Sequence, residues 1–233
     1  MHLLLAQREF AAYGPSHLAV LTLFAVGAVG LVLLGRRQSP SAGLRFSRML
    51  AVLLLALEVL TQTYAFTALD VKDALPLQLS DLAGFVAIYA LWSHRQWSFW
   101  LVYYWGLTLS VQALVSPALQ GPDFPSLKFQ AFWWVHIVTV WAAIYLTWGM
   151  RMRPNWAGYR FALLVTVCWA AVVLVINHFA GTNFGFLNRK PPTESLLNAF
   201  GPWPWYLLVA FALVLAVWAL ITWPWVRSRS TRS

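Results

Sequence analysis

A short polar cluster interrupts the apolar residues 75–85, which read LPLQLSDLAGF. The cluster consists of Gln78, Ser80 and Asp81, and apolar residues continue after it as far as Trp92. Polar and charged residues inside a membrane are costly, rare and usually functional. The stretch is therefore a candidate functional site, and its partners must come from neighbouring helices.

His136 is the histidine that lies deepest within an apolar segment and is a candidate functional residue. Glu58 is the second carboxylate inside such a segment, after Asp81. An isolated carboxylate in an apolar medium takes up a proton, or finds a cation or a hydrogen-bond donor. The acids and the histidines therefore fit a function in which they bind or transport a cation, a proton or a small polar solute.

The composition places these residues in a membrane. The chain has 233 residues, of which 61% are hydrophobic and 10% are charged, whereas soluble proteins carry about 25% charged residues. A membrane-spanning helix uses about 20 residues, so one membrane domain accounts for nearly the whole chain. We expect a multi-pass protein of the cell membrane whose partners are membrane lipids. The formal net charge of +9 fits the basic cytoplasmic loops of such a protein, and nucleic-acid binding is not expected.

Seven apolar segments are near the length that the hydrocarbon core requires, and backbone hydrogen bonding in lipid makes them helices. They are His17 to Leu34, Met49 to Leu69, Pro76 to Trp92, Phe99 to Ser116, Phe129 to Gly149, Tyr159 to Phe179 and Pro202 to Val226. The sequence therefore predicts an all-α fold, a polytopic bundle of seven transmembrane helices in a single domain over residues 1–226. A short interfacial helix is expected before the first span, and residues 227–233 are expected to form a disordered basic tail.

Basic residues are distributed unevenly between the two sides of this predicted bundle. The larger group comprises Arg36, Arg37, Arg45, Arg48, Arg95, Arg151, Arg153, Arg160, Arg227, Arg229 and Arg232. The smaller group comprises Arg8, Lys72, Lys128, Arg189 and Lys190. Because Lys and Arg accumulate in cytoplasmic loops, the imbalance predicts an N-terminus outside and a C-terminus in the cytoplasm.

Polar residues collect in the half of the bilayer that this orientation places outside, and six of the seven spans contribute to them. These polar residues are His17, Glu58, Gln62, Gln78, Ser80, Asp81, Gln112, His136, Asn177 and His178. The inner half holds almost none. Intramembrane polar groups face the bundle interior and pair with one another. The convergence therefore predicts a cavity that opens toward the outer leaflet or the outer surface.

Several of these residues also have a purely structural interpretation. Gln62, Gln112 and Asn177 could hydrogen bond between helices without touching a ligand. His17 and His178 lie near the membrane interface, where a histidine reaches headgroups or water. Both interpretations remain open at this point, so the polar set is a group of candidate binding residues.

The connection between the last two spans, residues 180–200, has the glycines and prolines of a turn-rich segment. It carries Asn183 and the basic pair Arg189 and Lys190 on the side where basic residues are scarce. The pair could anchor the loop to lipid headgroups. Alternatively, it could contact a phosphate or another anion above the cavity, because Arg and Lys are the usual phosphate donors.

Cofactor and metal motifs are not found. No HExxH pattern or close spacing of histidine and cysteine predicts a metal site, and no Gly-rich phosphate loop or haem box predicts a cofactor. The sequence also has no HxxxxD or GxSxG pattern of a standard acyltransferase or hydrolase. Cys168 is the single cysteine, so no disulfide forms within the chain.

Four blocks carry a resemblance to a known family: LPLQLSDLAGF, FPSLKF followed by FWWVHIV, GTNFGFLNRKP and SLLNAFGPWPWY. They closely resemble the conserved bacterial integral membrane family of the YwaF type. That family is related to the eukaryotic transmembrane protein 164, a membrane acyltransferase that acts on phospholipids. The resemblance extends from His17 to Trp205 and implies a polytopic membrane fold.

The resemblance also implies lipid acyl transfer through a cysteine and a histidine. The histidine falls on His136. The cysteine of the family pattern LPLHLCDL falls on Ser80, and Gln78 takes the place of the histidine in that pattern. This chain therefore departs from the pattern twice at the expected chemical site, and Ser80 would have to replace the cysteine as nucleophile. A serine attacks an acyl group only when a base takes its proton, so the resemblance makes His136 the candidate base, which Asp81 or Glu58 could orient.

Overall fold

The structure is a computed structural model that describes residues 8–191 and 195–230. Within these ranges the chain is helical, with no β-strand beyond one isolated bridge between Glu9 and Pro122. The α-helices are α1 (Pro15–Arg37), α2 (Pro40–Ala68), α3 (Leu79–Ser93), α4 (Gln96–Tyr104), α5 (Val111–Val115), α6 (Leu127–Ile144), α7 (Trp156–Ala180) and α8 (Trp205–Ser230). Two π-helical segments, η1 (Trp105–Ser110) and η2 (Tyr145–Gly149), and two short 3₁₀ helices, η3 (Phe184–Phe186) and η4 (Leu196–Phe200), complete the described elements.

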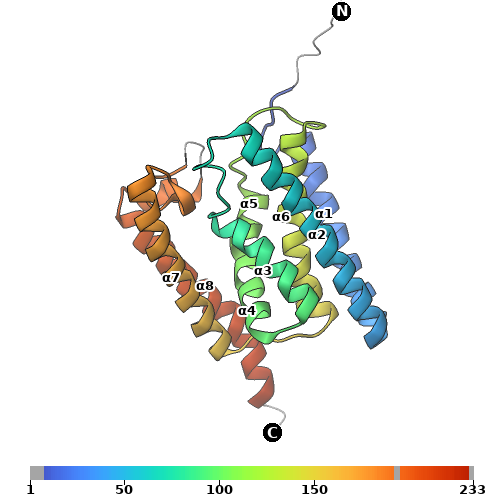
Figure 1. The fold of residues 1–233 in the computed structure, drawn as a ribbon. Helices are drawn as coiled ribbons and strands as arrows, with labels where there is room; N and C mark the ends of the chain where they lie inside the picture. Colours follow the sequence, from blue (N-terminus) through green and yellow to red (C-terminus); the bar gives the residue numbers. More distant parts are fainter. Residues whose placement is uncertain (1–7, 192–194, 231–233) are drawn as a thin grey trace, which may run out of the picture.

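The predicted all-α membrane bundle is confirmed at the level of its helices. Six helical stretches are long and apolar enough to cross a membrane, including the continuous stretches Gln96–Val115 and Leu127–Gly149. The remaining apolar helix, α3, has 15 residues and is too short to span the bilayer core by itself. Successive long helices run in opposite directions, and α1 begins at the end of the bundle opposite to the one where α8 finishes (Figure 1).

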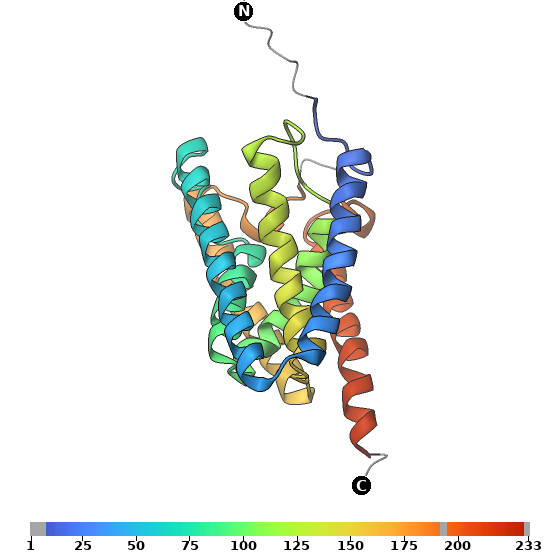
Figure 2. The same cartoon turned by 90° about the vertical axis from the view of Figure 1, so that its right-hand side faces the viewer.

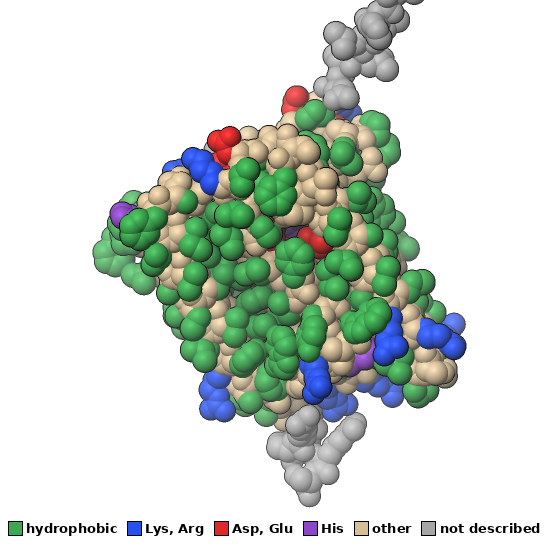
Figure 3. All heavy atoms as spheres, in the orientation of Figure 1, with side chains coloured by type: hydrophobic (Ala, Val, Ile, Leu, Met, Phe, Trp, Pro, Cys, Tyr) green, Lys and Arg blue, Asp and Glu red, His purple; other side chains and the backbone are tan. Residues whose placement is uncertain are grey.

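The two ends of the bundle differ in charge. Asp70, Asp73 and Asp123 lie in the loops where α3 and α6 begin, and we call this the acidic end. Arg45 and Arg95 lie with most other arginines at the opposite end, which we call the basic end. On the face shown in Figure 3, most of the basic side chains gather along the lower edge, and hydrophobic side chains cover the middle.

Side-chain caps and prolines fix where several helices begin. Ser39 accepts a hydrogen bond from the backbone N–H of Ala42, and Pro40 occupies the first turn of α2. This cap starts α2 nine residues before the predicted Met49, because a helix can extend beyond the membrane core when its end is capped. Asn155 caps α7 in the same way, accepting from the N–H of Gly158 at 2.8 Å.

The two chain ends also differ from the prediction. Residues 8–14 form no helix, because their backbone instead pairs with the loop before α6 through Phe10 N–H and the carbonyl oxygen of Gly121 at 2.9 Å. The expected interfacial helix is therefore absent from residues 8–14, and residues 1–7 lie outside the described ranges. At the other end, α8 continues past Val226 to Ser230, and the predicted tail beyond it, residues 231–233, is likewise outside them.

The core lies where α2, α3, α4 and α6 meet, and Figure 2 shows α6 between α1 and α2. Its α3 face is made of small residues, Ala83, Ala87 and Ala90, which are completely buried. Small residues let helices approach closely in a membrane, where lipid is as apolar as a large side chain. Phe85, Tyr89 and Trp92 are the large residues of α3 that are exposed.

Each of the two π-helical segments contains a threonine that bonds to local backbone. In η1 the Thr108 hydroxyl donates to the carbonyl oxygen of Tyr104 at 2.5 Å, and in η2 the Thr147 hydroxyl donates to that of Ala143 at 2.6 Å. Thr166 makes the same bond to Ala162 within the regular helix α7, so this bond alone does not produce the π geometry.

Gly27 on α1 is expected to be sensitive to substitution. A Cβ atom at this position would meet the indole ring of Trp141 on α6, and that ring is held by a 3.0 Å hydrogen bond to the carbonyl oxygen of Phe24. We predict that Gly27→Ala destabilises the protein by about 1–3 kcal/mol, measured by thermal unfolding in detergent. Gly30→Ala is the control, because a Cβ there has nothing within 4 Å. Equal stability of the two variants would contradict the packing of α1 on α6.

Candidate functional site

The first turn of α3 carries the proposed nucleophile. The Oδ2 atom of Asp81 accepts from the backbone N–H of Gln78 at 3.1 Å, and the side chain of Ser80 also hydrogen bonds to the Asp81 carboxyl group. The N–H groups of Asp81 and Leu82 both donate to the carbonyl oxygen of Gln78. Among the described residues, the N–H groups of Leu79 and Ser80 have no partner. The start of α3 therefore presents two free backbone donors beside Ser80.

Glu58 on α2 lies against α3 at Gly84. Its side chain is 4% exposed, and its Oε1 atom has no hydrogen-bond partner among the described residues. A Cβ atom on Gly84 would collide with this oxygen, so glycine leaves the space that the carboxyl group occupies. Asp81 lies close enough to Glu58 for the two to interact electrostatically. The structure thus brings the two intramembrane acids of the prediction together at one helix contact.

An acidic side chain is visible in the middle of the hydrophobic face in Figure 3, away from both charged ends. Glu58 and Asp81 are the acids that lie within described helices. Asp81 remains partly exposed although protein atoms surround it on most sides. The acidic pair is therefore reached from the surface that faces lipid.

His136 lies on α6, which packs against both α2 and α3. Its Nδ1 atom is 2.6 Å from the carbonyl oxygen of Phe132. Because a carbonyl group can only accept, Nδ1 carries the proton of the neutral ring, and Nε2 is left as an acceptor. Nε2 has no hydrogen-bond partner in the described part of the chain, and the ring is partly exposed. The imidazole is therefore a free base held in one tautomer.

The structure does not join these groups into the predicted relay. No hydrogen bond among the described residues connects His136 to Ser80, Asp81 or Glu58, and Asp81 bonds instead to the neighbouring Ser80. The surface also carries hollows elsewhere. One of about 380 Å³ is lined by Trp156, Ala219, Leu220 and Trp223, and one of about 410 Å³ by Ala12, Tyr13, Ser116, Pro117 and Ser195. Neither is lined by the three candidate catalytic residues.

Gln78 and Gln62 hold the loops around the start of α3. The Oε1 atom of Gln78 accepts from the N–H of Gly185 at 2.8 Å, which ties α3 to the turn η3. Gln62 on α2 donates its side-chain N–H to the carbonyl oxygen of Ala74 in the loop before α3. Trp169 on α7 donates to the carbonyl oxygen of Leu77 at 3.1 Å. Both glutamines therefore position the segment that carries Ser80.

Asn177 organises the loop after α7. Its amide is buried, donates to the carbonyl oxygen of Phe184 at 3.0 Å and accepts from the N–H of the same residue at 2.8 Å. The hydroxyl of Thr182 donates to the same Asn177 oxygen at 2.8 Å. Asn183 completes the loop, because its side chain bonds to both the carbonyl and the N–H of Arg189. Asn177 and Asn183 are thus occupied by loop backbone.

The other candidate binding residues lie apart from Ser80. Lys190 donates to the carbonyl oxygen of Asn198 at 3.3 Å and lies over the ring of Tyr206, 5.7 Å from its centroid. Arg189, His178 and Gln112 are exposed. Three of the set, Lys190, Arg189 and His178, lie near the acidic end of α7 and α8, and they are accessible from outside the bundle.

His17 is completely buried between α1, α5 and α6. Its Nδ1 atom accepts from the backbone N–H of Tyr13 at 2.8 Å, and its Nε2 lies 2.8 Å from the carbonyl oxygen of Leu114. The ring stacks on Trp133 with a centroid separation of 5.0 Å. Both nitrogens are therefore used within the fold, and the predicted polar set is divided between separate places instead of lining one cavity.

Sequence reasoning missed a polar network in the half of the bundle nearer the basic end. The Tyr104 hydroxyl hydrogen bonds with that of Thr222 at 2.6 Å, and Trp105 donates to Thr166 at 2.9 Å. Trp218 donates to Thr108 at 3.0 Å. The prediction of an almost apolar inner half is therefore wrong. The sequence does contain the threonines, tyrosines and tryptophans of this network. They were overlooked because the aromatic residues count as hydrophobic in the composition, although each has one polar atom.

The sequence matches the TMEM164 family over residues 12–222. The chain belongs to the TMEM164 family. No curated protein and no solved structure matches it. Ser80, Asp81, Glu58 and His136 all lie inside the matched range, and the resemblance noted in four sequence blocks is confirmed for this family.

Within the described residues, no group of three His, Cys, Asp or Glu residues could hold a metal ion.

Proposed function

We propose that this TMEM164 family member transfers or hydrolyses the acyl group of a membrane lipid ester, with Ser80 as nucleophile and His136 as base. The observation that carries the proposal is the position of Ser80 at the start of α3. There, the free N–H groups of Leu79 and Ser80 can stabilise an oxyanion, as preorganised backbone donors do in acyl-transfer enzymes. The serine also falls on the cysteine position of the family pattern, where the resemblance implies the nucleophile.

The reaction proceeds in two steps. The Oγ atom of Ser80 bonds to the ester carbonyl carbon while its proton passes to Nε2 of His136, and the oxyanion lies near the N–H groups of Leu79 and Ser80. The intermediate then releases the lipid alkoxide, which takes the proton back from His136. A second hydroxyl, from water or from an acceptor lipid, gives its proton to Nε2 of His136 and bonds to the acyl carbon. The bond to Oγ of Ser80 then breaks, and His136 returns the proton to that oxygen.

Asp81 holds the Ser80 hydroxyl before substrate arrives. For proton transfer the hydroxyl must turn from Asp81 toward α6, which packs directly against α3. Catalytic hydrogen bonds are commonly long or unformed without substrate and tighten in the complex. Binding of the ester carbonyl beside Leu79 therefore completes the site in this proposal.

We also propose that the acidic end of the bundle faces the outside and the basic end the cytoplasm. The greater number of arginines at the basic end supports this orientation. Ser80 lies in the half nearer the acidic end, so the lipid would be taken from the outer leaflet.

The test is lipid-ester turnover by the protein in phospholipid vesicles, with release of a labelled acyl chain as readout. We expect His136→Asn to lower turnover by roughly 10²–10⁴-fold, because it removes the base, while the thermal midpoint stays near that of the unchanged protein. His178→Asn is the control, because His178 is an exposed histidine away from α3. Full turnover in the His136 variant would remove the proposal.

A second function is favoured by one observation, the unpartnered Oε1 atom of Glu58 beside Asp81. A buried carboxyl group without a donor is a candidate for proton or cation binding in a membrane. Ser80→Ala separates the two functions, since it stops acyl transfer but leaves the acidic pair in place. Under the second function, Glu58→Gln instead removes binding.

A further inference from the structure

An exposed corner that combines arginines with an aromatic ring lies at the basic end, on α2 and α3, where no candidate site was predicted. Arg48 on α2 places its guanidinium group over the indole ring of Trp92 on α3, 5.4 Å from the ring centroid. Trp92 is 53% exposed, so this pair forms part of the outer surface. Arg45 is exposed one turn before Arg48, on the same side of α2. Two arginines and one aromatic ring therefore share a surface corner.

The corner is fixed by hydrogen bonds between the two helices. Ser47 donates its hydroxyl to the carbonyl oxygen of Leu91 at 2.6 Å, and Nε2 of His94 lies 2.9 Å from the same Ser47 oxygen. Because the Ser47 proton is already used, His94 is the donor of the second bond. These bonds hold the start of α2 to the end of α3, so Arg48 and Trp92 keep a constant spacing.

The positive charge at this corner is not neutralised by the protein. Arg45, Arg48 and Arg95 have no carboxylate partner among the described residues, whose acids lie near the acidic end or at the Glu58–Asp81 pair. Burial lowers the pKa of His94, and the charge of Arg48 lowers it further. A positive charge that no anion neutralises disfavours protonation of a nearby imidazole, and His94 shows this effect. The corner therefore favours an anion.

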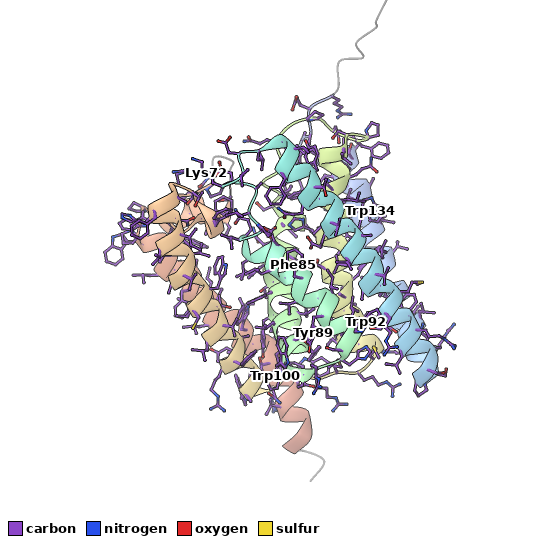
Figure 4. All side chains as sticks on the ribbon, in the orientation of Figure 1. Lys72, Phe85, Tyr89, Trp92, Trp100 and Trp134 are labelled. Atoms are coloured by element: carbon purple, nitrogen blue, oxygen red, sulfur yellow. The ribbon has the colours of Figure 1, made fainter. Side chains whose placement is uncertain are left out.

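The surface toward the membrane interior is apolar. Phe85, Tyr89 and Trp92 follow one face of α3, and Figure 4 shows these three residues on the side of α3 that faces away from the bundle. From Trp92 to Phe85 this face runs about 10 Å along the helix. Figure 3 shows basic side chains around a histidine at the lower edge, with hydrophobic side chains directly above them. A ligand that fits both parts has an anionic head and an apolar chain.

We propose that Arg45, Arg48 and Trp92 bind the headgroup of an anionic phospholipid in the leaflet at the basic end, with its acyl chain along Tyr89 and Phe85. Arginine recognises a phosphate through paired N–H donors, and the indole holds the guanidinium in place. The apolar face of α3 distinguishes this ligand from an acidic protein segment, which has no chain to cover Tyr89. The inference is independent of acyl transfer at Ser80.

The experiment uses the full-length protein in phosphatidylcholine vesicles that contain spin-labelled phosphatidylglycerol or spin-labelled phosphatidylcholine. The fraction of motionally restricted label gives the relative association of the two lipids. We expect a preference for phosphatidylglycerol that falls about fivefold in Arg48→Gln, since one basic residue near an anionic surface contributes about a factor of this size. Arg45→Gln/Arg48→Gln should lower it further, and Trp92→Leu by about two- to fivefold.

The matched control is Arg36→Gln/Arg37→Gln, which removes the same charge at the same end of the bundle but on α1. We expect it to leave the preference nearly unchanged. Equal restriction of both lipids by the unchanged protein would overturn the proposal. An equal loss in the control would also overturn it, because the preference would then come from overall charge. A retained preference in all α2 and α3 variants would place the anion elsewhere and have the same consequence.

Discussion

Ser80→Ala is expected to abolish lipid-ester turnover, with a loss on the order of 10³-fold or more, as removal of an acyl nucleophile does in serine enzymes. The variant keeps the backbone at the start of α3 and removes only the oxygen that forms the acyl bond. Ser80→Cys is expected to keep turnover, because a thiol is intrinsically the stronger nucleophile and Cys is the residue of the family pattern. The measurement is release of a labelled acyl chain from phospholipid in vesicles.

The cysteine variant gives a second readout when Cys168, the single native cysteine, is replaced by alanine. Ser80→Cys/Cys168→Ala should then lose turnover on treatment with a membrane-permeant maleimide, while the Cys168→Ala protein should not. Ser93→Ala is the matched control on the same helix, where the hydroxyl bonds only to local backbone of residues 89 and 95. If Ser80→Ala and Ser93→Ala retain the same turnover, Ser80 is not the nucleophile.

Asn177→Ala is expected to cause the largest loss of stability among the polar candidates. It leaves both backbone groups of Phe184 and the hydroxyl of Thr182 without their partner, and these residues are buried. Each unpaired buried group costs about 1–3 kcal/mol, and the costs overlap within one loop. We expect a total of roughly 2–5 kcal/mol in thermal unfolding, together with faster proteolysis of the loop 181–191.

The loop matters for the site because Gly185 donates to Gln78, directly before the turn that carries Ser80. Asn177→Ala should therefore also lower lipid-ester turnover, although Asn177 has no contact with Ser80. The control is Asn198→Ala, since that side chain is exposed and only its backbone carbonyl accepts a bond from Lys190. If Asn177→Ala and Asn198→Ala have the same thermal stability and the same rate of proteolysis in the loop, Asn177 does not organise the loop.

The sequence predicted the membrane class and the helical fold, and it identified Glu58 and Asp81 as intramembrane acids. These predictions rest on the free-energy cost of placing charged residues and unpaired backbone groups in lipid. That cost can be judged for each segment by itself, without knowing which segments pack together. Asp81 and Glu58 stand out for the same reason, because a carboxylate inside an apolar segment has few stable arrangements. The structure places the two near each other, an arrangement that the cost of burial does not predict, because two carboxylates repel.

The sequence could not show which polar residue pairs with which. His17 fits an intramembrane ligand equally well, yet its ring nitrogens are used by Tyr13 and Leu114, which lie at quite different distances along the chain. The start of α3 was also placed too early, because Pro76 and Leu77 are apolar but the helix begins only after the extended backbone of Gln78. Such pairings depend on tertiary contacts between segments and not on the character of a single one.

The basic-end network was missed for a related reason. Tyr104 and Trp218 count with leucine as hydrophobic residues in the composition, but each carries one polar atom that needs a partner when buried. Thr222 and Thr108 supply those partners from other helices. Pairing threonines with aromatic polar atoms in the sequence would have suggested candidate hydrogen bonds. Which threonine meets which aromatic residue, however, depends on how α8 packs on α4.

The most direct test of Ser80 as the acyl-carrying residue is mass spectrometry of the peptide that contains it, after the protein has been incubated with phospholipid and quenched in acid. We expect an added mass equal to one acyl chain on Ser80, which in the His136→Asn variant is present only at a much lower level. A peptide that remains unmodified while the protein turns over lipid ester, or an acyl group found on another residue, would contradict Ser80 as the acyl-carrying residue.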